Sequence, residues 1–535
     1  MDALARQQEL VGRVAGALRA AAGAVQRYET HISWVLVAGG HAYKFKKALA
    51  LPFMDCSTLA ARRFYCFEEY RLNRRLAPDL YLGVVAVGGG RASPAIGAPG
   101  APLDYAVHMR AFGQDALWSA RLARGRLGGG EVDRLAASLA AFHGQAPRAP
   151  AAAGWGSPET VAGAFAATLA ALEAEAEAAE LAHDAAAALA AVRAWLARRQ
   201  PAFAGLVAAR RAAGMVRECH GDLHCSNLLT LGDQVQAFDC IEFDPALRWI
   251  DVIDDLAFAC MDLGCRGRSD LAARLLNAYL EHSGDYAGLA VLPDYRVHRA
   301  LVRARVVLLR ARQGGAPDAV RRACLRRGRS YLRYAQRCTR PAGPVLVAMH
   351  GFSGSGKTGV ARRLVELLGA VQLRSDVERK RLPGAGPVAQ DLRYGEDAAR
   401  RTYARLGELA RAALRAGWPV VVDAACLLAA QRRGLRDLAA ELALPFFLVD
   451  VRAAPATLRA RLAARQAAGE DASDADAAVL AMQLGSAEPL APDERAQAIV
   501  IDTDTDTAAG GGADRLRAAS APMLAALARG RTAAG

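Results

Sequence analysis

The chain has 535 residues, of which 53% are hydrophobic and 23% are charged, and its formal net charge is +14. This length exceeds what one hydrophobic core usually organises, so we expect two or three domains, and the apolar content excludes a largely disordered chain. The positive charge permits an anionic partner such as nucleic acid. The arginines are scattered over the sequence instead of forming one run, so we do not favour nucleic acid.

The cysteines and the first residues indicate a reducing compartment. Ten cysteines are spread singly, with no CxxC pair and no Cys/His set at zinc-binding spacing. The start, MDALARQQEL, has no apolar signal core, and no uncharged apolar stretch long enough to span a bilayer follows. We therefore expect a cytoplasmic protein that does not bind a membrane. The sequence leaves the oligomeric state open.

Lysine is rare in this chain. Among the 68 lysines and arginines, only five are lysines, namely Lys44, Lys46, Lys47, Lys357 and Lys380. Arginine presents a planar fork, whereas lysine is a compact point charge on a flexible stem. The few lysines therefore mark positions at which a compact ammonium group is useful.

Strands around one helix are expected from about residue 25 to 112. The segment SWVLVAGGHAYKFKKAL predicts two strands joined by a Gly-Gly turn. The segment STLAARRFYCFEEYRLNRRLAP has helical spacing, starts with Ser57 as the expected cap and ends before Pro78. DLYLGVVAV and LDYAVHMRAF predict further strands. Together these segments predict a β-rich small lobe.

The sequence is mostly helical over residues 117–336, but a polar loop interrupts it. The stretch ECHGDLHCSNLL contains His220, Asp222 and Asn227 in the pattern H-x-D-x-x-x-x-N. This is the catalytic-loop spacing of eukaryotic-type kinases. The strand QVQAFD then delivers Asp239 at the place where a second metal-binding carboxylate belongs.

Upstream, HAYKFKK supplies a strand lysine and CFEEYRLN a helical acid, so the order is lysine, glutamate, catalytic loop, metal aspartate. These residues resemble the aminoglycoside phosphotransferase family, which has the protein-kinase-like fold. The resemblance covers about residues 25–333. It implies a small lobe and a helical large lobe, and ATP-dependent phosphorylation of a hydroxyl group with Mg²⁺.

The resemblance implies a role for each matched residue of the loop. Asp222 would accept the proton of the acceptor hydroxyl, and His220 would orient the loop. Asn227 and Asp239 would hold Mg²⁺. Asp255, in DVIDDLAF, would brace the loop without reacting.

The nucleotide half of this site leaves two alternatives open. The resemblance implies that Glu69 pairs with a strand lysine on the α- and β-phosphates, and that VHMRAF near Met109 grips adenine. Lys44 and Lys46 both qualify, because they lie two residues apart on one strand face, and we favour Lys44. The AGG at residues 38–40 is short for a glycine-rich loop. A pseudokinase module that senses a ligand and regulates the other half is therefore an alternative.

The segment RCTRPAGP, residues 337–344, is the expected linker. The expected limits are a first domain of residues 1–338 (small lobe about 25–112, large lobe about 113–338), a linker of residues 339–343, and a second domain of residues 344–535. After the linker, VLVAMH, AVQLRSD, WPVVVDAA, PFFLVDV and AIVIDTD are short apolar strands separated by helical stretches. This alternation predicts an α/β domain with a parallel sheet.

The sequence GFSGSGKT, residues 351–358, fits the P-loop pattern G-x-x-x-x-G-K-[ST] between a buried strand and an amphipathic helix. Its glycines let successive N–H groups point at phosphate oxygens, and the helix N-terminus adds positive potential. Lys357 would reach the outer phosphates, and Thr358 would help to hold Mg²⁺. The other expected nucleotide-binding residues are Gly351, Ser353, Gly354, Ser355 and Gly356.

Polar residues follow the next strands, at the sheet edge where ligands bind in such folds. We expect Asp376 to take a proton from an acceptor hydroxyl and Asp423 to orient Mg²⁺ through water. The alternative for each is that it caps the following helix. Arg461 and Arg465 lie four apart in LRARLAARQ, and we expect them to clamp the transferring phosphate. The alternative for this pair is a solvated helix face.

Residues 341–507 resemble P-loop kinases that act on small molecules or on polynucleotide 5′-hydroxyls, including zeta-toxin-like kinases. The resemblance implies ATP-dependent phosphorylation with Asp376 as the base, and it does not identify the acceptor. The whole chain resembles bacterial fusions of an aminoglycoside phosphotransferase-like domain to such a kinase. We therefore expect two ATP sites in one chain, each acting on a small-molecule hydroxyl. A nucleic-acid 5′-hydroxyl is the alternative acceptor for the second domain.

Overall fold

The structure is a computed structural model, and its described residues group by their contacts into two compact units. Unit 1 contains Met1–Ala167 and Gln200–Asp262, and unit 2 contains Thr168–Arg199 and Leu263–Gly535. The described residues are 3–51, 54–178, 181–312, 317–340, 343–382, 395–468, 476–505 and 512–533. The expected domain limits stay a prediction, and residues 341 and 342 of the expected linker lie outside the described residues.

Unit 1 contains a six-stranded antiparallel sheet in the order β1-β2-β3-β8-β6-β7. Its strands are β1 (Gln26–Glu29), β2 (Ser33–Ala38), β3 (His41–Lys46), β6 (Tyr81–Gly90), β7 (Ser93–Ile96) and β8 (Asp104–Arg110). Gly39 and Gly40 join β2 to β3 with φ values of 57° and 78°. Both values lie in the left-handed region that a two-residue hairpin turn requires, so the predicted hairpin is confirmed.

Helix α1 (Ala3–Ala22), which the sequence analysis did not predict, packs on this sheet. Val11 and Val14 are fully buried in one core cluster with Trp34 of β2. The buried side chain of Gln7 donates to the backbone oxygen of Lys46 at 2.7 Å and accepts from the Ala48 N–H at 2.6 Å. These contacts fix the end of the strand that carries the lysines.

Helix α2 (Leu59–Asn73) is the predicted helix between the strands, and it ends before Pro78 as expected. Its cap differs from the prediction. The Thr58 side chain accepts from the Ala61 N–H, whereas the Ser57 N–H donates to Asp55. The helix begins one residue later than expected, and the hydroxyl that faces its first turn is therefore that of Thr58.

The predicted helical region contains more short strands than the sequence indicated. Its helices and strands are α3 (Trp118–Ala123), α4 (Gly129–Gln145), α5 (Pro158–Ala178), α6 (Ala182–Ala212), β9 (Val216–Glu218), β10 (Leu228–Leu231), β11 (Gln234–Ala237), β12 (Trp249–Asp251) and α7 (Val252–Cys265). β10 pairs with the predicted strand β11, and β12 pairs with β9. Two residues each from β4 (Ala50–Leu51) and β5 (Met54–Asp55) form a further small ribbon. The loop of Asp222 lies between β9 and β10.

Unit 2 contains a five-stranded sheet whose strands are all parallel, in the order β14-β15-β13-β16-β17. The strands are β13 (Leu346–His350), β14 (Val371–Arg374), β15 (Val420–Asp423), β16 (Phe446–Arg452) and β17 (Ile499–Asp502). All five predicted strands are confirmed. The predicted helix after the P-loop is α11 (Lys357–Leu368), which ends at Gly369 with φ of 65°.

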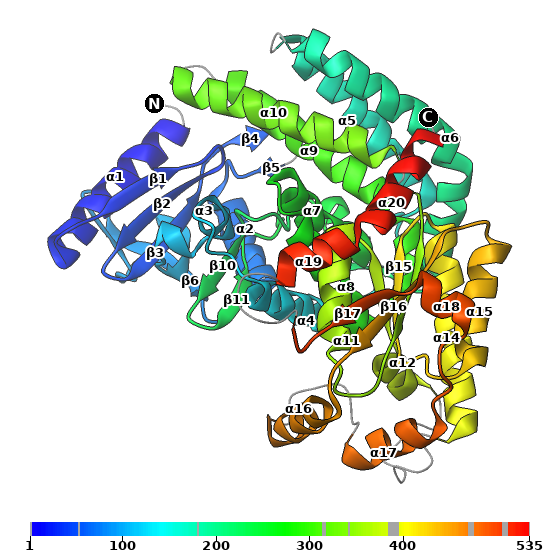
Figure 1. Cartoon of the computed structure of the whole chain (residues 1–535). Coiled ribbons are helices and arrows are strands. Elements are labelled where there is room, and N and C mark those ends of the chain that lie inside the picture. The colour runs from blue at the N-terminus through cyan, green and yellow to red at the C-terminus, as the bar shows by residue number, and fades with distance from the viewer. Residues whose placement is uncertain are drawn as a thin grey trace. The chain divides into compact units, whose positions relative to one another are not determined.

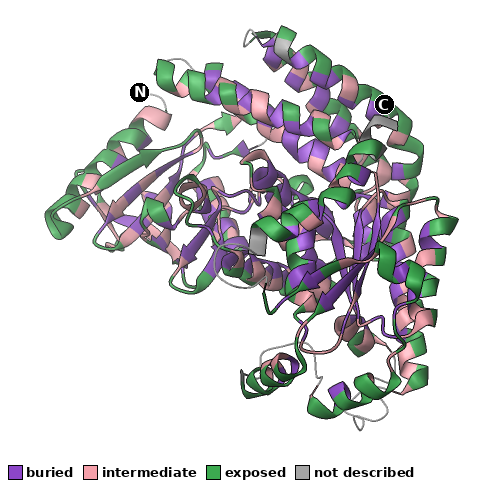
Figure 2. Cartoon of the chain, in the orientation of Figure 1, coloured by how far each residue is buried: buried purple, intermediate pink, exposed green. Residues whose placement is uncertain are grey.

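The other helices of unit 2 precede, connect or follow these strands. Besides the parts of α5 and α6 within Thr168–Arg199, the helices among the described residues of this unit are α8 (Ser269–Ser283), α9 (Leu292–Arg312), α10 (Asp318–Cys338), α12 (Ser375–Arg381), α14 (Glu396–Arg415), α15 (Ala429–Glu441), α16 (Pro455–Ala468), α17 (Ala477–Ser486), α18 (Pro492–Gln497), α19 (Gly512–Ala519) and α20 (Ala521–Ala533). The strands of the parallel sheet are drawn among these helices in Figure 1. Figure 2 shows that burial is concentrated in those strands, as expected for a sheet covered by crossover helices.

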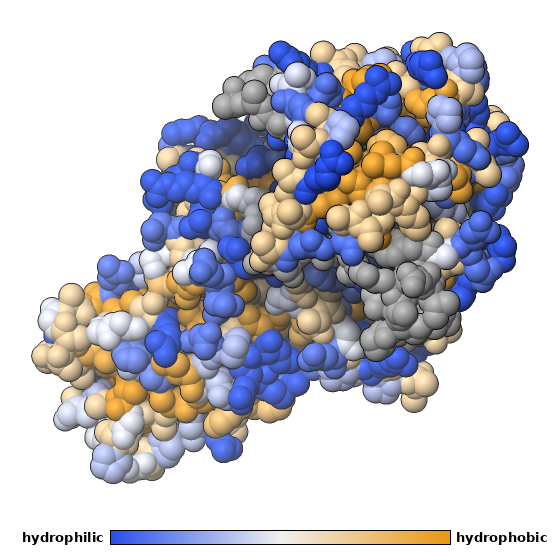
Figure 3. Space-filling view, turned by 60° about the horizontal axis from the view of Figure 1, so that its bottom comes forward, coloured by the Kyte–Doolittle hydropathy of each residue, from blue (hydrophilic) through white to orange (hydrophobic). Residues whose placement is uncertain are grey.

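Within the described residues, no helix is both long and apolar enough to cross a membrane. On the face drawn in Figure 3, hydrophilic side chains are interspersed with hydrophobic ones.

Candidate active sites

Asp255 of α7 holds the backbone of the loop that carries Asp222 in unit 1. Its carboxylate accepts the backbone N–H groups of His220 and Gly221, both at 2.9 Å. Gly221 has φ of 85°, and a side chain there would lie 2.6 Å from the backbone oxygen of Leu247. Only glycine fits this turn, so the geometry agrees with the bracing role that the resemblance implies for Asp255.

Asp222 and Asn227 meet within this loop. The Asn227 amide donates to the backbone oxygen and to Oδ2 of Asp222, both at 3.0 Å. The Asp222 side chain stays 29% exposed. His220 Nε2 lies 2.9 Å from the Phe238 backbone oxygen, and burial lowers the pKa of this imidazole. His220 is therefore held as a neutral group that fixes the loop, while Asp222 keeps access to solvent.

Three charged groups from distant segments converge beside the loop. The Nζ atom of Lys44 on β3 lies 2.8 Å from Glu69 of α2 and 2.5 Å from Asp239. Asp239 has φ of 63°, and its N–H donates to the Tyr81 hydroxyl at 3.2 Å. Burial raises the pKa of Asp239, but the attraction of Lys44 outweighs it and lowers the pKa overall. Asp239 is thus held as a carboxylate beside the lysine.

Lys46 lies on the same strand face as Lys44 but is buried more deeply. Its side chain is fully buried, whereas that of Lys44 is 12% exposed, and it pairs with Glu69 and Glu242. Burial raises the pKa of Glu242. Lys44 therefore lies beside Asp239, whereas Lys46 belongs to a buried ion cluster with Glu69 and Glu242. This difference supports Lys44 as the expected phosphate-binding lysine. The role of either lysine on phosphate stays a prediction.

The nucleotide-binding parts of this site are less complete. Met109 of β8 is buried in a cluster with Ala42, and its expected place at the adenine hinge stays a prediction. The turn between β1 and β2, residues 30–32, contains no glycine, and Gly39 and Gly40 form the tight turn between β2 and β3. Gly39 and Gly40 of the short AGG stretch thus belong to the hairpin turn between β2 and β3.

The P-loop of unit 2 lies between β13 and α11, and its glycines are required by close contacts. A side chain at Gly351 would lie 2.3 Å from the Val451 backbone oxygen, and one at Gly354 would lie 2.6 Å from that of Leu458. Gly356 has φ of 88° and caps α11, so the chain turns with its N–H groups at the helix start. The members of the loop that line the cavity are Ser353, Gly354, Gly356, Lys357 and Thr358.

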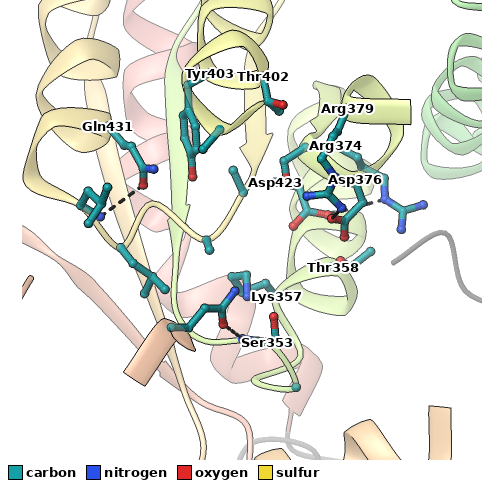
Figure 4. Close-up of a pocket in the computed structure, with 18 of the residues that line it drawn as sticks. Ser353, Lys357, Thr358, Arg374, Asp376, Arg379, Thr402, Tyr403, Asp423 and Gln431 are labelled. Atoms are coloured by element: carbon teal, nitrogen blue, oxygen red, sulfur yellow. Dashed lines mark hydrogen bonds and ion pairs between the residues drawn. The ribbon is translucent and has the colours of Figure 1, made fainter. Parts of the chain in front are cut away.

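Lys357 and Asp423 both line this cavity (Figure 4). The Lys357 ammonium donates to the Phe352 backbone oxygen at 2.7 Å, and burial lowers its pKa. Asp423 accepts at 2.9 Å from the amide of Gln372. Burial raises the pKa of Asp423, and the attraction of nearby cations opposes that rise. The helix that follows Asp423 has Leu428 as its N-cap, so the capping alternative is wrong for Asp423.

Asp376 lies in the first turn of α12, on the wall of the same cavity. Its carboxylate pairs with Arg379 at 2.7 Å, and α12 has no side-chain cap. Figure 4 shows Asp376 beside Arg374 and Arg379. This position, at the ends of the parallel strands, agrees with the expected place of a base, and its role stays a prediction.

The arginines of α16 also reach the cavity wall. Arg461 donates to the Thr503 hydroxyl at 2.7 Å and to the Gly354 backbone oxygen at 3.4 Å. Arg465 lines the cavity. Arg461 is thus held against the P-loop. The structure therefore gives this arginine specific partners that a solvated helix face would not require.

The cavity has a volume of about 1230 Å³ and contains residues that the sequence analysis missed. The Gln483 side chain of α17 accepts the Ser353 N–H at 2.9 Å, and the Tyr403 hydroxyl accepts the Cys426 N–H at 2.9 Å. Arg374 could have been found, since it is the last residue of a predicted strand at the ligand-binding edge. Gln483 and Tyr403 could not be found in this way, because they lie within helices and not at the end of a predicted strand.

The donor atoms of both sites suit Mg²⁺, which prefers oxygen ligands. Asn227 and Asp239 supply an amide and a carboxylate in unit 1. Thr358 and Asp423 supply a hydroxyl and a carboxylate in unit 2, and both line the same cavity. The residues present therefore fit the expected metal.

Comparison with known proteins assigns both parts of the chain. The family model "Phosphotransferase enzyme family" matches residues 107–292, and the model "AAA domain" matches residues 346–490. "Uncharacterized protein Rv2004c" of Mycobacterium tuberculosis (strain ATCC 25618 / H37Rv) is 30% identical over 472 residues, covering 85% of this chain and 89% of the relative. "Uncharacterized protein Mb2027c" of Mycobacterium bovis (strain ATCC BAA-935 / AF2122/97) matches with the same figures. The chain belongs to the family of these mycobacterial proteins.

Solved kinase structures are similar to each part of the chain. A gluconokinase from Sinorhizobium meliloti 1021 is 25% identical and covers 35% of this chain and 94% of its own, with a TM-score of 0.24. A choline/ethanolamine kinase family protein from Mesorhizobium loti is 14% identical and covers 62% of this chain and 99% of its own, with a TM-score of 0.34. The expected resemblance, an aminoglycoside phosphotransferase-like domain joined to a P-loop kinase domain, is confirmed by the family models. The chain is an ATP-dependent phosphotransferase.

Proposed function

We propose that the chain is a bifunctional kinase with two ATP sites, each transferring phosphate to a hydroxyl group of a small molecule. The observation that carries this proposal is that each unit gathers its own lysine, candidate base and pair of oxygen donors. In unit 2 all of these groups line or floor one cavity large enough for a nucleotide and an acceptor. We further propose that both sites use Mg²⁺, which neutralises the triphosphate when it is bound.

In the first site Asp222 takes the proton of the acceptor hydroxyl as phosphate is transferred. Asn227 holds Asp222 in place and shares the metal with Asp239. Lys44, oriented by Glu69, contacts the α- and β-phosphates. A positioned base of this kind contributes about 10²–10⁴-fold to the rate, and the cations stabilise the charge of the transition state.

In the second site the P-loop N–H groups and Lys357 bind the phosphates at the start of α11. Thr358 and Asp423 hold the metal, and Asp376 accepts the proton of the hydroxyl. Arg461 and Arg465 clamp the phosphoryl group as it moves. The acceptor binds on the wall formed by α12 and α14, opposite the P-loop.

One observation favours a second candidate function for unit 1. The turn between β1 and β2 has no glycine, and in protein kinases a glycine-rich loop is what covers the phosphates. In this alternative, unit 1 senses a nucleotide or another ligand and regulates the kinase of unit 2. The complete set of Asp222, Asn227 and Asp239 supports catalysis instead.

Incubation of a metabolite extract with ATP and the purified full chain tests the proposal. Mass spectrometry should find metabolites that gain the mass of one phosphate. Products lost in Asp222→Asn belong to the first site, and products lost in Lys357→Ala belong to the second. If no product depends on Asp222, the sensing function is correct for unit 1. A product formed only from an oligonucleotide with a free 5′-hydroxyl would assign a nucleic-acid acceptor to unit 2.

A further inference from the structure

Helix α8 precedes the P-loop segment by more than sixty residues, yet it packs against that segment within unit 2. It lies inside the phosphotransferase match and outside the AAA-domain match. Three of its residues, Ala273, Asn277 and Glu281, are spaced four apart and therefore share one helix face. Ala273 is buried in the same core cluster as the strands and helices around the P-loop.

Asn277 completes the edge of the parallel sheet. Strand β14 is the last strand on its side, so its outer N–H and C=O groups need partners from elsewhere. The Asn277 amide donates to the Ala370 backbone oxygen at 2.8 Å and accepts the Gln372 N–H at 2.6 Å. The side chain of Gln372 in turn donates to Asp423 at 2.9 Å. A single buried amide of α8 thus fixes the strand residue that orients Asp423.

Glu281 acts one helical turn further along. Its carboxylate pairs with the guanidinium of Arg374, the last residue of β14, whose side chain is buried and lines the cavity. The Nε atom of Arg374 also lies 3.9 Å from Asp423. Arg374 is therefore shared between two carboxylates, and the contact with Glu281 is the closer one. A buried guanidinium that lost one of these partners would move towards the other.

We propose that α8 is a built-in part of the P-loop active site, in which Glu281 is a positioning residue that holds Arg374 away from Asp423. The oxygen atoms of Asp423 then stay available for Mg²⁺ instead of being paired with the guanidinium. This inference rests on the proposed function of unit 2, and it adds a requirement: the metal site of the P-loop kinase depends on a helix that its family model does not contain. Glu281 acts through Arg374 and does not itself touch nucleotide.

The test uses the full chain and titrates Mg²⁺ against binding of a fluorescent ATP analogue, mant-ATP. The component of binding that Lys357→Ala removes defines the second site. The variants are Glu281→Gln, Arg374→Gln and the double variant. Arg274→Gln is the matched control, because it breaks another α8 ion pair, with Glu366 on α11 at 3.4 Å, away from the cavity.

Glu281→Gln should raise the apparent Mg²⁺ dissociation constant about tenfold, the scale of one partly screened ion pair formed at Asp423. Affinity for mant-ATP without Mg²⁺ should change less than about twofold, because the P-loop contacts remain. The apparent Mg²⁺ dissociation constant of the double variant should equal that of Arg374→Gln, because the guanidinium that competes with Mg²⁺ for Asp423 is then absent. Arg274→Gln should match the wild-type chain. This pattern would not follow from a purely structural role of Glu281.

Two results would overturn the inference while leaving the kinase intact: Glu281→Gln behaving like Arg274→Gln, or the double variant binding Mg²⁺ no better than Glu281→Gln. If the wild-type chain shows no component that depends on Lys357, the proposed function of unit 2 fails and the inference fails with it. Urea unfolding of each variant confirms that the compared chains are folded.

Discussion

The ammonium group of Lys44 lies 2.5 Å from the carboxylate of Asp239, although 195 positions separate the two residues in the chain. One belongs to strand β3 and the other follows β11, so only the folded unit brings them together. Their contact, with Glu69 on the other side of the lysine, gives unit 1 the charge arrangement on which its proposed chemistry depends.

The two strand lysines should respond differently to substitution. Lys44→Ala should abolish ATP turnover at the first site and cost less stability than Lys46→Ala, because Glu69 keeps Lys46 and the Asp239 side chain is 45% exposed. Lys46→Ala should lower the free energy of unfolding by about 3–5 kcal/mol, because it leaves Glu242 buried without its cation, whereas Glu69 keeps Lys44. Urea unfolding and ATP turnover, measured on both variants, check this. Equal stability of the two variants would contradict the separation of roles.

Asp222→Asn should leave nucleotide binding nearly unchanged and lower turnover at the first site by about 10²–10⁴-fold, because only the proton acceptor is lost. ATP turnover should be measured in chains that also carry Lys357→Ala, so that the second site is inactive. Unchanged turnover in that double variant would refute the assignment of Asp222.

Lys357→Ala should abolish ATP use by the second site, since this ammonium is the cation that the P-loop directs at the phosphates. Lys380→Ala is the matched control, because Lys380 is an exposed lysine of α12 in the same unit and does not line the cavity. ATP hydrolysis in chains carrying Asp222→Asn isolates the second site. Equal loss in both lysine variants would contradict a specific role for Lys357.

MgATP should bind to the second site over a narrower pH range than ordinary aspartate and lysine side chains would allow. Burial raises the pKa of Asp423, so metal binding should weaken on acidification at a higher pH than for an ordinary aspartate. Burial lowers the pKa of Lys357, so phosphate binding should weaken on the alkaline side before an ordinary lysine would lose its charge. Titration of mant-ATP across pH should show both limbs. In Asp423→Asn the acid limb should be reduced, and an unchanged acid limb would contradict the assignment.

Asp255 should contribute to stability through the loop that it braces. Burial raises its pKa, but hydrogen bonds and the attraction of His143 outweigh it and lower the pKa to about 2. From an ordinary value near 3.8, this corresponds to about 2 kcal/mol, present above pH 3.8 and lost as the pH falls through about 2. Asp255→Asn should lower the free energy of unfolding at pH 7 by at least this amount. Asp244→Asn, which keeps an oxygen that can accept the Ala246 N–H at the cap of a short 3₁₀ turn, should cost less than about 1 kcal/mol.

The sequence predicted the elements whose signals are local. The parallel strands of unit 2 are short apolar runs between helical stretches, and all five form where the pattern placed them. The hairpin follows from two adjacent glycines, which alone adopt its backbone angles without strain. Helix α1 was missed because its apolar residues are mostly alanine, and it is fixed mainly by burial of Val11 and Val14 on a sheet that the local sequence does not contain.

The candidate sites likewise contain residues that a local motif revealed and residues that only the folded chain brings in. The P-loop and the loop of Asp222 are contiguous motifs, so spacing alone revealed them. Gln483, Tyr403 and Glu281 are single residues on helices, and nothing in their neighbourhoods marks them as parts of a site. Their positions depend on how helices pack around the sheet, which one sequence does not encode in any short pattern.

The amino-acid sequence by itself determined that two phosphate-binding motifs share one chain, because glycines, lysines and carboxylates at fixed spacing are required by the chemistry of phosphate transfer. Only the tertiary structure decided which of Lys44 and Lys46 lies beside Asp239, and that a helix of the phosphotransferase segment holds the edge of the P-loop sheet. Both depend on burial. A strand face does not show from its sequence which lysine meets solvent, and a sheet edge does not show which side chain will satisfy its free N–H and C=O groups.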